Sequence, residues 1–262
     1  MATSHVVMRD QNLPQVLART RQLLIGMAPM LLLYALYTVV RFLVKDRGPA
    51  EGIRNANDVL HLERRLGFDW EGAIQKVLLP HEWLVVVANW YYVAGFLPVI
   101  LVAAGISAML DYQNFLWWRR RFALTLILAL IGFALYPLAP PRMLPGMVDT
   151  LMVYGPRYYG DHDGASIFNL YGRIPSLVNV YAAMPSMHVA WSIIAGALMI
   201  SALRKHWWIW IVGVAHPVLM AVAVVVTANH YVLDVVVGVA ALLGALGLLR
   251  LGNALKSRWI HD

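Results

Sequence analysis

The chain has 262 residues, of which 60% are hydrophobic and 13% are charged. Soluble domains are about 45–50% apolar and about 25% charged, so this composition excludes an ordinary soluble domain and indicates a polytopic membrane protein. There is no cysteine and the net charge is +7. The first fact excludes disulfides, thiolate nucleophiles and cysteine-ligated metal or haem sites. The second does not indicate nucleic-acid binding here, because arginine and lysine flank membrane spans on the cytoplasmic side.

Six apolar stretches are candidates to cross a bilayer, which needs about 20 residues for each span. They lie roughly at 22–44, 83–110, 122–138, 187–203, 207–228 and 231–251. The second is overlong, which predicts a tilted span or an interfacial part, and the third and fourth are short. No repeat, low-complexity tract or linker divides the chain. We therefore expect an all-α fold, with one domain over residues 1–262 that forms a six-helix transmembrane bundle.

Basic residues gather in four segments of this arrangement. They are Arg9, Arg19 and Arg21; Arg119, Arg120 and Arg121; Arg204 and Lys205; and Arg250, Lys256 and Arg258. All four segments fall on one side, which the positive-inside rule makes cytoplasmic, although the first outer loop also carries several basic residues. We therefore expect both termini in the cytoplasm. Arginine outnumbers lysine and alanine, valine and leucine abound, which is typical of a GC-rich bacterial genome and favours a bacterial plasma membrane.

Two outer loops remain. The first, at about 45–82, has apolar residues at helical spacing: Leu60, Leu62, Leu66, Ile74, Val77 and Leu78. This pattern predicts one or two amphipathic helices on the membrane surface, with a packed cap as the alternative. The second, at about 139–184, has no clear periodicity. Long loops of this kind are more often functional than decorative.

A histidine and an aspartate share one face of the last predicted helix. His230 and Asp234 are four residues apart, and the chain is then apolar up to Arg250. A carboxylate at the centre of a membrane helix costs about 2.5–3.5 kcal/mol, and less near an end. One interpretation is a structural hydrogen bond that ties two helices together. The other, which we favour, is an aspartate that orients His230 and stabilises its imidazolium form.

Three polar groups meet at the outward side of the six-span arrangement. His188 follows Pro185-Ser186 at the start of the fourth span, where serine is a good cap and proline suits a first turn. Arg142 follows the third span, and His230 lies between the fifth and sixth. His188 alone would be read as a buried core histidine, but the three together predict an active site at the extracytoplasmic face.

Two histidines, one carboxylate and one arginine, without a thiol, suit phosphoryl transfer. One imidazole attacks phosphorus to form a phosphohistidine, and the other protonates the leaving oxygen. Arginine and a helix N-terminus hold the phosphate oxygens.

At these residues the sequence resembles the type-2 phosphatidic acid phosphatase superfamily, whose motifs are KxxxxxxRP, PSGH and SRxxxxxHxxxD. Residues 185–188 (PSMH) match the second motif, His230 and Asp234 match the third, and Arg142 matches the arginine of the first. The resemblance covers about 130–240. It implies that His230 is the nucleophile, Asp234 its partner, His188 the general acid/base and Arg142 a phosphate ligand. It also implies lipid substrates, a six-helix fold and no metal or other cofactor.

The departures favour one branch of this family. Leu135 stands where the first motif has lysine, and Ala223-Val224 replaces the Ser-Arg pair of the third. The surrounding variants resemble inositol phosphorylceramide synthase and sphingomyelin synthase, which transfer a phospho-head group between lipids. Their phosphodiester carries one charge less, which fits fewer cations. Arg157 and Arg173 are candidates to supply charge or to be solvated.

Several alternatives stay open at this point. Ser186, Tyr181 and Asn229 neighbour the histidines and are candidate substrate-binding residues. Water competes with an alcohol as acceptor, which would make the enzyme a lipid phosphate phosphatase. Two histidines and a carboxylate could also hold a metal, and buried His and Asp could serve a proton-coupled transporter.

Two further groups are given structural interpretations. Residues 161–163 (Asp-His-Asp) read as a solvated turn more than as a metal cluster, because glycines flank them. His216-Pro217, inside the fifth span, reads as a kink with a satisfied histidine.

Overall fold

The computed structural model describes residues 13–44, 48–159 and 180–261. This part of the chain is helical and contains no strand, apart from one isolated bridge between Leu138 and Ala182. The α-helices are α1 (Leu13–Val44), α2 (Gly48–Leu66), α3 (Glu71–Leu78), α4 (Glu82–Ala94), α5 (Leu97–Leu110), α6 (Tyr112–Leu135), α7 (Thr150–Tyr159), α9 (Met187–Leu203), α10 (Trp207–Val226) and α11 (Val232–His261). A short 3-10 helix, η1, covers Pro141–Met143. The expected all-α class is confirmed.

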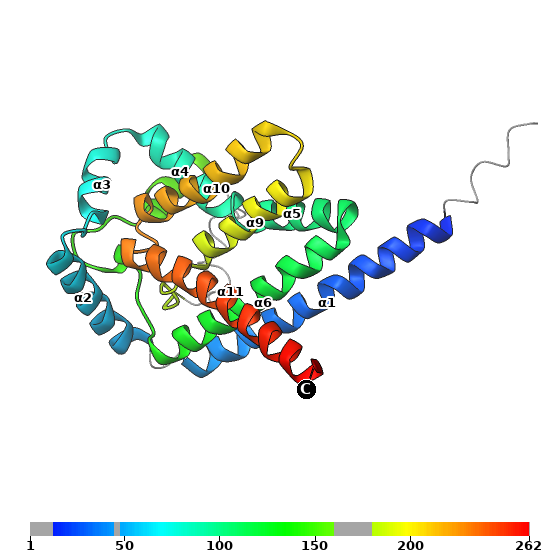
Figure 1. Ribbon diagram of the computed structural model, residues 1–262. Coiled ribbons are helices and arrows are strands. Elements are labelled where there is room, and N and C mark those ends of the chain that lie inside the picture. The colour runs from blue at the N-terminus through cyan, green and yellow to red at the C-terminus, as the bar shows by residue number, and fades with distance from the viewer. Residues whose placement is uncertain (1–12, 45–47, 160–179, 262) are drawn as a thin grey trace, which may run out of the picture.

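Helix α9 lies at the centre of the bundle. It packs against α5, α6, α10 and α11, and α1 packs against α6 (Figure 1). Small residues allow the closest of these contacts, because a Cβ on Gly196 of α9 would collide with the carbonyl group of Gly213 on α10. Small residues at such crossings let helix backbones approach in membrane bundles.

Length and composition identify α10 and the Val232–Ser257 part of α11 as candidate membrane spans. Helices α4 and α5 pass the same test together, but they bend by 48° at the break between them. The single overlong stretch expected at 83–110 is therefore two helices, with Pro98 in the first turn of the second one. Helix α9 is apolar, but its 17 residues are fewer than the about 20 that a membrane span needs. The six-span bundle therefore stays a prediction.

Helix α6 differs from the stretch expected at 122–138. It begins at Tyr112, because the Asp111 side chain caps the helix by accepting a hydrogen bond from the Asn114 amide at 3.0 Å. It ends at Leu135, shortly before Pro137. The residue before a proline is disfavoured in the helical conformation, which explains the end of this helix.

The first outer loop contains the expected helices, α2 and α3. Both lie at the end of the bundle that is opposite the C-terminus (Figure 1). Asn55, Glu63, Glu71 and Gln75 are buried there. Both helices thus pack on the bundle, as the alternative of a packed cap expects. The apolar side chains of Leu66, Trp70 and Val77 remain exposed. The exposed apolar face is also what an interfacial helix requires.

The second outer loop is more regular than its sequence indicated, since it contains η1 and α7. Buried amides fix its path. The Gln75 side chain accepts from the Val148 amide and donates to the Val148 carbonyl, both at 2.9 Å. Asn89 of α4 donates to the Thr150 carbonyl at 3.0 Å and accepts from the Thr150 hydroxyl at 2.8 Å. These contacts hold the segment after Arg142 against the bundle.

Candidate active site

His230 lies in the tight turn that joins α10 to α11. Ala228 in this turn has a φ of 52°, which a non-glycine residue rarely adopts. The turn is held by local bonds: the Thr227 hydroxyl donates to the Ala223 carbonyl at 2.8 Å, and the His230 amide donates to the Val224 carbonyl at 3.1 Å. Such strain persists only where the surroundings fix it, and it is often found at functional sites.

Two acceptors determine the tautomer of His230. Its Nδ1 lies 2.8 Å from the Ala183 carbonyl oxygen and 3.2 Å from Asp234 Oδ2. A carbonyl and a carboxylate can only accept, so Nδ1 carries the proton and the neutral ring has its lone pair on Nε2. Asp234 Oδ2 also accepts from the Tyr231 amide at 2.9 Å. His230 therefore presents an unprotonated nitrogen in a fixed direction.

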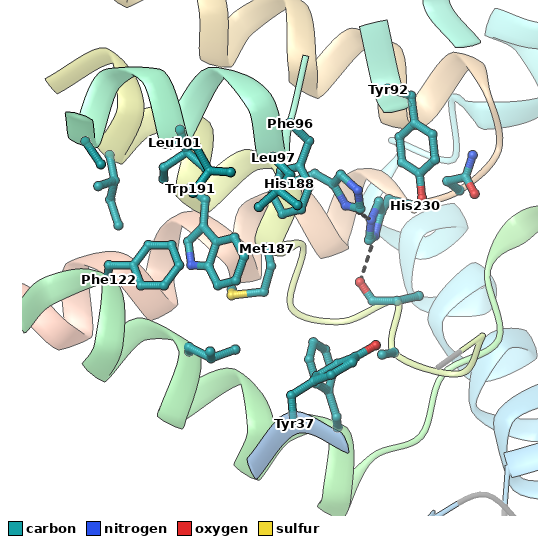
Figure 2. A pocket seen from close by; sticks show the side chains of 18 of the residues that line it. Tyr37, Tyr92, Phe96, Leu97, Leu101, Phe122, Met187, His188, Trp191 and His230 are labelled. Atoms are coloured by element: carbon teal, nitrogen blue, oxygen red, sulfur yellow. Dashed lines mark hydrogen bonds between the residues drawn. The ribbon is translucent and has the colours of Figure 1, made fainter. Parts of the chain in front are cut away.

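His188, in the first turn of α9, faces that nitrogen. Its Nδ1 lies 3.2 Å from His230 Nε2, so Nδ1–H of His188 donates to the His230 lone pair. The His188 ring stacks on Tyr92 with ring centroids 4.6 Å apart and lies 4.3 Å from the centroid of Phe96 (Figure 2). The two imidazoles are thus in direct contact, with a hydrogen-bond donor on His188 and an acceptor on His230.

Arg142 reaches the same turn from η1. Its amide donates to the Ala228 carbonyl at 2.9 Å, which fixes the backbone. Its guanidinium donates to the Asn229 side-chain oxygen and pairs with Asp149 at 3.2 Å. The side chain of Arg142 lines the same cavity as both histidines. An anion bound there would find a guanidinium held in position by two partners.

The site opens into a cavity of about 460 Å³, a size typical of small-molecule sites. Arg142, His188, Asn229 and His230 contribute polar groups to it. Most of the remaining lining is apolar or aromatic: Tyr37, Phe96, Leu101, Phe122, Met187 and Trp191 are examples (Figure 2). Such a cavity suits a molecule with a polar head and an apolar tail.

Not all of the predicted substrate-binding residues line the cavity. Asn229 lines the cavity, while Tyr181 is absent from its lining and packs beside Gly52. Ser186 is the N-cap residue of α9, but its hydroxyl makes no capping bond; its amide donates to the Asp234 carbonyl at 3.0 Å. Arg173, residues 161–163 and the side chain of Arg157 lie outside the described part of the chain.

The structure describes one of the two groups that were given structural interpretations, His216-Pro217. His216 Nδ1 lies 2.6 Å from the Tyr91 hydroxyl, so this nitrogen has the expected partner inside the bundle, whereas Nε2 is buried without a hydrogen-bond partner among the described residues. Within the described residues, no three His, Asp or Glu side chains are grouped so as to hold a metal ion.

Several contacts at the site could not be predicted from the sequence. Tyr92 and Phe96 carry no motif, and Asp149 stands in a loop without periodicity. Glu63 and Glu71 come from the first outer loop, and each accepts a 2.7 Å hydrogen bond from a backbone amide in the first turn of α11. All of these contacts join residues that are far apart in the sequence, so only the fold could reveal them.

Apolar helices and a histidine pair at the polar part of an apolar cavity define an integral membrane enzyme. The chain belongs to the PAP2 superfamily, whose family model matches residues 57–248, and the resemblance to the type-2 phosphatidic acid phosphatases is thereby confirmed. It is also 30% identical over 182 residues to a protein of Bacteroides thetaiotaomicron named phosphoinositol dihydroceramide synthase. That alignment covers 63% of this chain and 56% of the relative. No solved structure matches the chain significantly.

Proposed function

We propose that this protein transfers a phospho-head group, of the inositol-phosphate type, from one membrane lipid to another through a phosphohistidine on His230. The observation that carries the proposal is the 3.2 Å contact between His188 Nδ1 and the unprotonated Nε2 of His230, at the polar part of an apolar cavity. The similarity to a phosphoinositol dihydroceramide synthase supports the choice of head group.

In the first half-reaction, His230 Nε2 attacks the phosphorus of the donor lipid. The bond between phosphorus and the oxygen of the departing lipid breaks, and His188 Nδ1–H gives its proton to that oxygen. Asp234 and the Ala183 carbonyl hold the His230 Nδ1 proton, so the carboxylate balances the positive charge that develops on the ring. Arg142 binds the phosphate oxygens.

In the second half-reaction, His188 takes the proton from a hydroxyl of the acceptor lipid. That oxygen attacks the phosphorus, the bond from phosphorus to His230 Nε2 breaks, and the enzyme returns to its starting state. Because the His188 and His230 nitrogens are only 3.2 Å apart, a substrate phosphate must displace this hydrogen bond when it binds.

The absence of two family cations supports a transferase over a phosphatase. Leu135 stands where the first family motif has lysine. Ala223-Val224 stands where the third motif has a serine and an arginine. A phosphodiester carries one negative charge less than a phosphomonoester, so a site with fewer cations suits it better. Water as acceptor would make the same site a lipid phosphate phosphatase, and this is the alternative that the experiment must separate.

The proposal includes a topology with six spans, formed by α1, the bent pair α4–α5, α6, α9, α10 and α11. The termini are then cytoplasmic, and the histidines face the outer side of a bacterial plasma membrane. The position of α2 and α3 at the histidine end of the bundle supports this arrangement (Figure 1). Cysteine accessibility labelling at His81 and Ser257 tests it, since the two positions should react from opposite sides.

The experiment uses purified wild type and His230→Ala with phosphatidylinositol labelled in its phosphate, with and without ceramide or diacylglycerol. We expect label in a new lipid, and an acid-labile, base-stable label on the wild-type protein that His230→Ala lacks. His61→Ala, which removes an exposed imidazole from α2, is the matched control. Release of water-soluble inositol phosphate without any acceptor product would establish hydrolysis, and full activity of His230→Ala would refute the nucleophile.

A further inference from the structure

Two buried glutamates from separate helices meet at the N-terminus of α11. Glu71 Oε1 on α3 accepts from the Val232 amide, and Glu63 Oε1 on α2 accepts from the Leu233 amide, both at 2.7 Å. Both side chains are fully buried. The first amides of a helix have no partner within it, and negative charge is favoured there. The glutamates therefore fix the turn of α11 from which Asp234 projects.

The second oxygens of the two glutamates raise a question of charge. Glu63 Oε2 and Glu71 Oε2 are buried and have no hydrogen-bond partner among the described residues. The two carboxyl groups bind the consecutive amides of Val232 and Leu233, so they lie close to each other at the same helix end. Ionised carboxylates only accept hydrogen bonds, so a bond between them requires that one carries a proton.

The surroundings support a shared proton. Asp234 on α11 adds a third carboxylate at this helix end, since it accepts from the Tyr231 amide while Glu71 and Glu63 accept from the next two amides. Burial, together with the charges of Glu71 and Asp234, raises the pKa of Glu63 to about 8, and burial raises the pKa of Glu71 as well. Like charges and desolvation both disfavour a second ionisation at such a pair.

We infer that Glu63 and Glu71 form a carboxyl pair that shares one proton and acts as a positioning device for Asp234 and His230. This inference rests on the proposed function. Neither glutamate lines the cavity, so the pair acts only through α11. Loss of the shared proton at alkaline pH puts two charges side by side, weakens the turn and reduces turnover. The first outer loop thus positions the groups of the active site without lining the cavity.

The test compares the full-length wild type with Glu63→Gln and Glu63→Ala across pH 6–10. A glutamine keeps an oxygen for the Leu233 amide and a permanent donor for Glu71, so Glu63→Gln should keep activity and lose the alkaline decline. Glu63→Ala leaves the buried Leu233 amide unpaired and should lower kcat about tenfold or more with little change in KM. Glu51→Gln, on the same helix, is the control.

A second measurement separates this inference from the proposed function. Infrared difference spectra should show a protonated-carboxyl C=O band in the wild type that titrates at alkaline pH and is absent in Glu63→Gln. If the band is missing and Glu63→Gln keeps the wild-type pH profile, the shared proton is refuted, while head-group transfer stands. If no transfer occurs but the band is present, the proposed function fails and the pair remains.

Discussion

Asp234→Asn tests how His230 is held. Asp234 Oδ2 is one of two acceptors for the His230 Nδ1 proton, and the Ala183 carbonyl, at 2.8 Å, is the nearer. The asparagine side chain keeps the shape and removes the charge, so the carbonyl still selects the tautomer with a free Nε2. The variant then loses one charge-assisted hydrogen bond to the His230 ring. Such a bond is worth about 1.5–3 kcal/mol, which corresponds to a roughly 10- to 150-fold lower kcat. A wrong tautomer costs about 10⁴-fold in a catalytic triad.

The assay is the initial rate of head-group transfer under saturating donor lipid, with Asp58→Asn on the exposed face of α2 as the control. A loss of about 10⁴-fold would refute the reasoning, because it would mean that the Ala183 carbonyl does not hold the tautomer. An unchanged kcat would also refute the reasoning, because Asp234 would then not stabilise the imidazolium form of His230.

Three further changes test the surroundings of the site. A Cβ on Gly238 would lie 2.5 Å from the Ser186 carbonyl oxygen, so Gly238→Ala should cost about 1–3 kcal/mol and lower Tm, while Gly247→Ala, with open space around it, should not. Arg142→Lys loses the guanidinium fork and should lower kcat/KM about 10- to 100-fold in lipid-transfer kinetics; equal values would remove Arg142 from phosphate binding. Because the pKa of Glu63 rises from 4.5 to about 8, its contribution to the unfolding free energy is largest below pH 4.5 and is lost as the pH rises to about 8. Tm of Glu63→Gln relative to wild type should rise over this window, and a constant difference would contradict the raised pKa.

Much of the helix pattern could be predicted because apolar length and spacing are local properties of the chain. The last two spans and the helices of the first outer loop were expected near their observed positions. The break between α4 and α5 was not, since the residues on both sides of it are apolar. Helix α7 was also missed, because contacts such as that between Asn89 and Thr150 support it from another part of the chain.

The sequence by itself determined the membrane class, the family motifs and the pairing of His230 with Asp234. Their spacing of four residues on a helix requires no knowledge of the fold. Only the tertiary structure decided which nitrogen of His230 is free, because that depends on the carbonyl of Ala183, 47 positions away. The tertiary structure also places Glu63 beside the Leu233 amide, although the two residues are 170 positions apart in the sequence. Hydrogen bonds between distant segments leave no periodic trace in a sequence, since each partner is placed by the packing of whole helices.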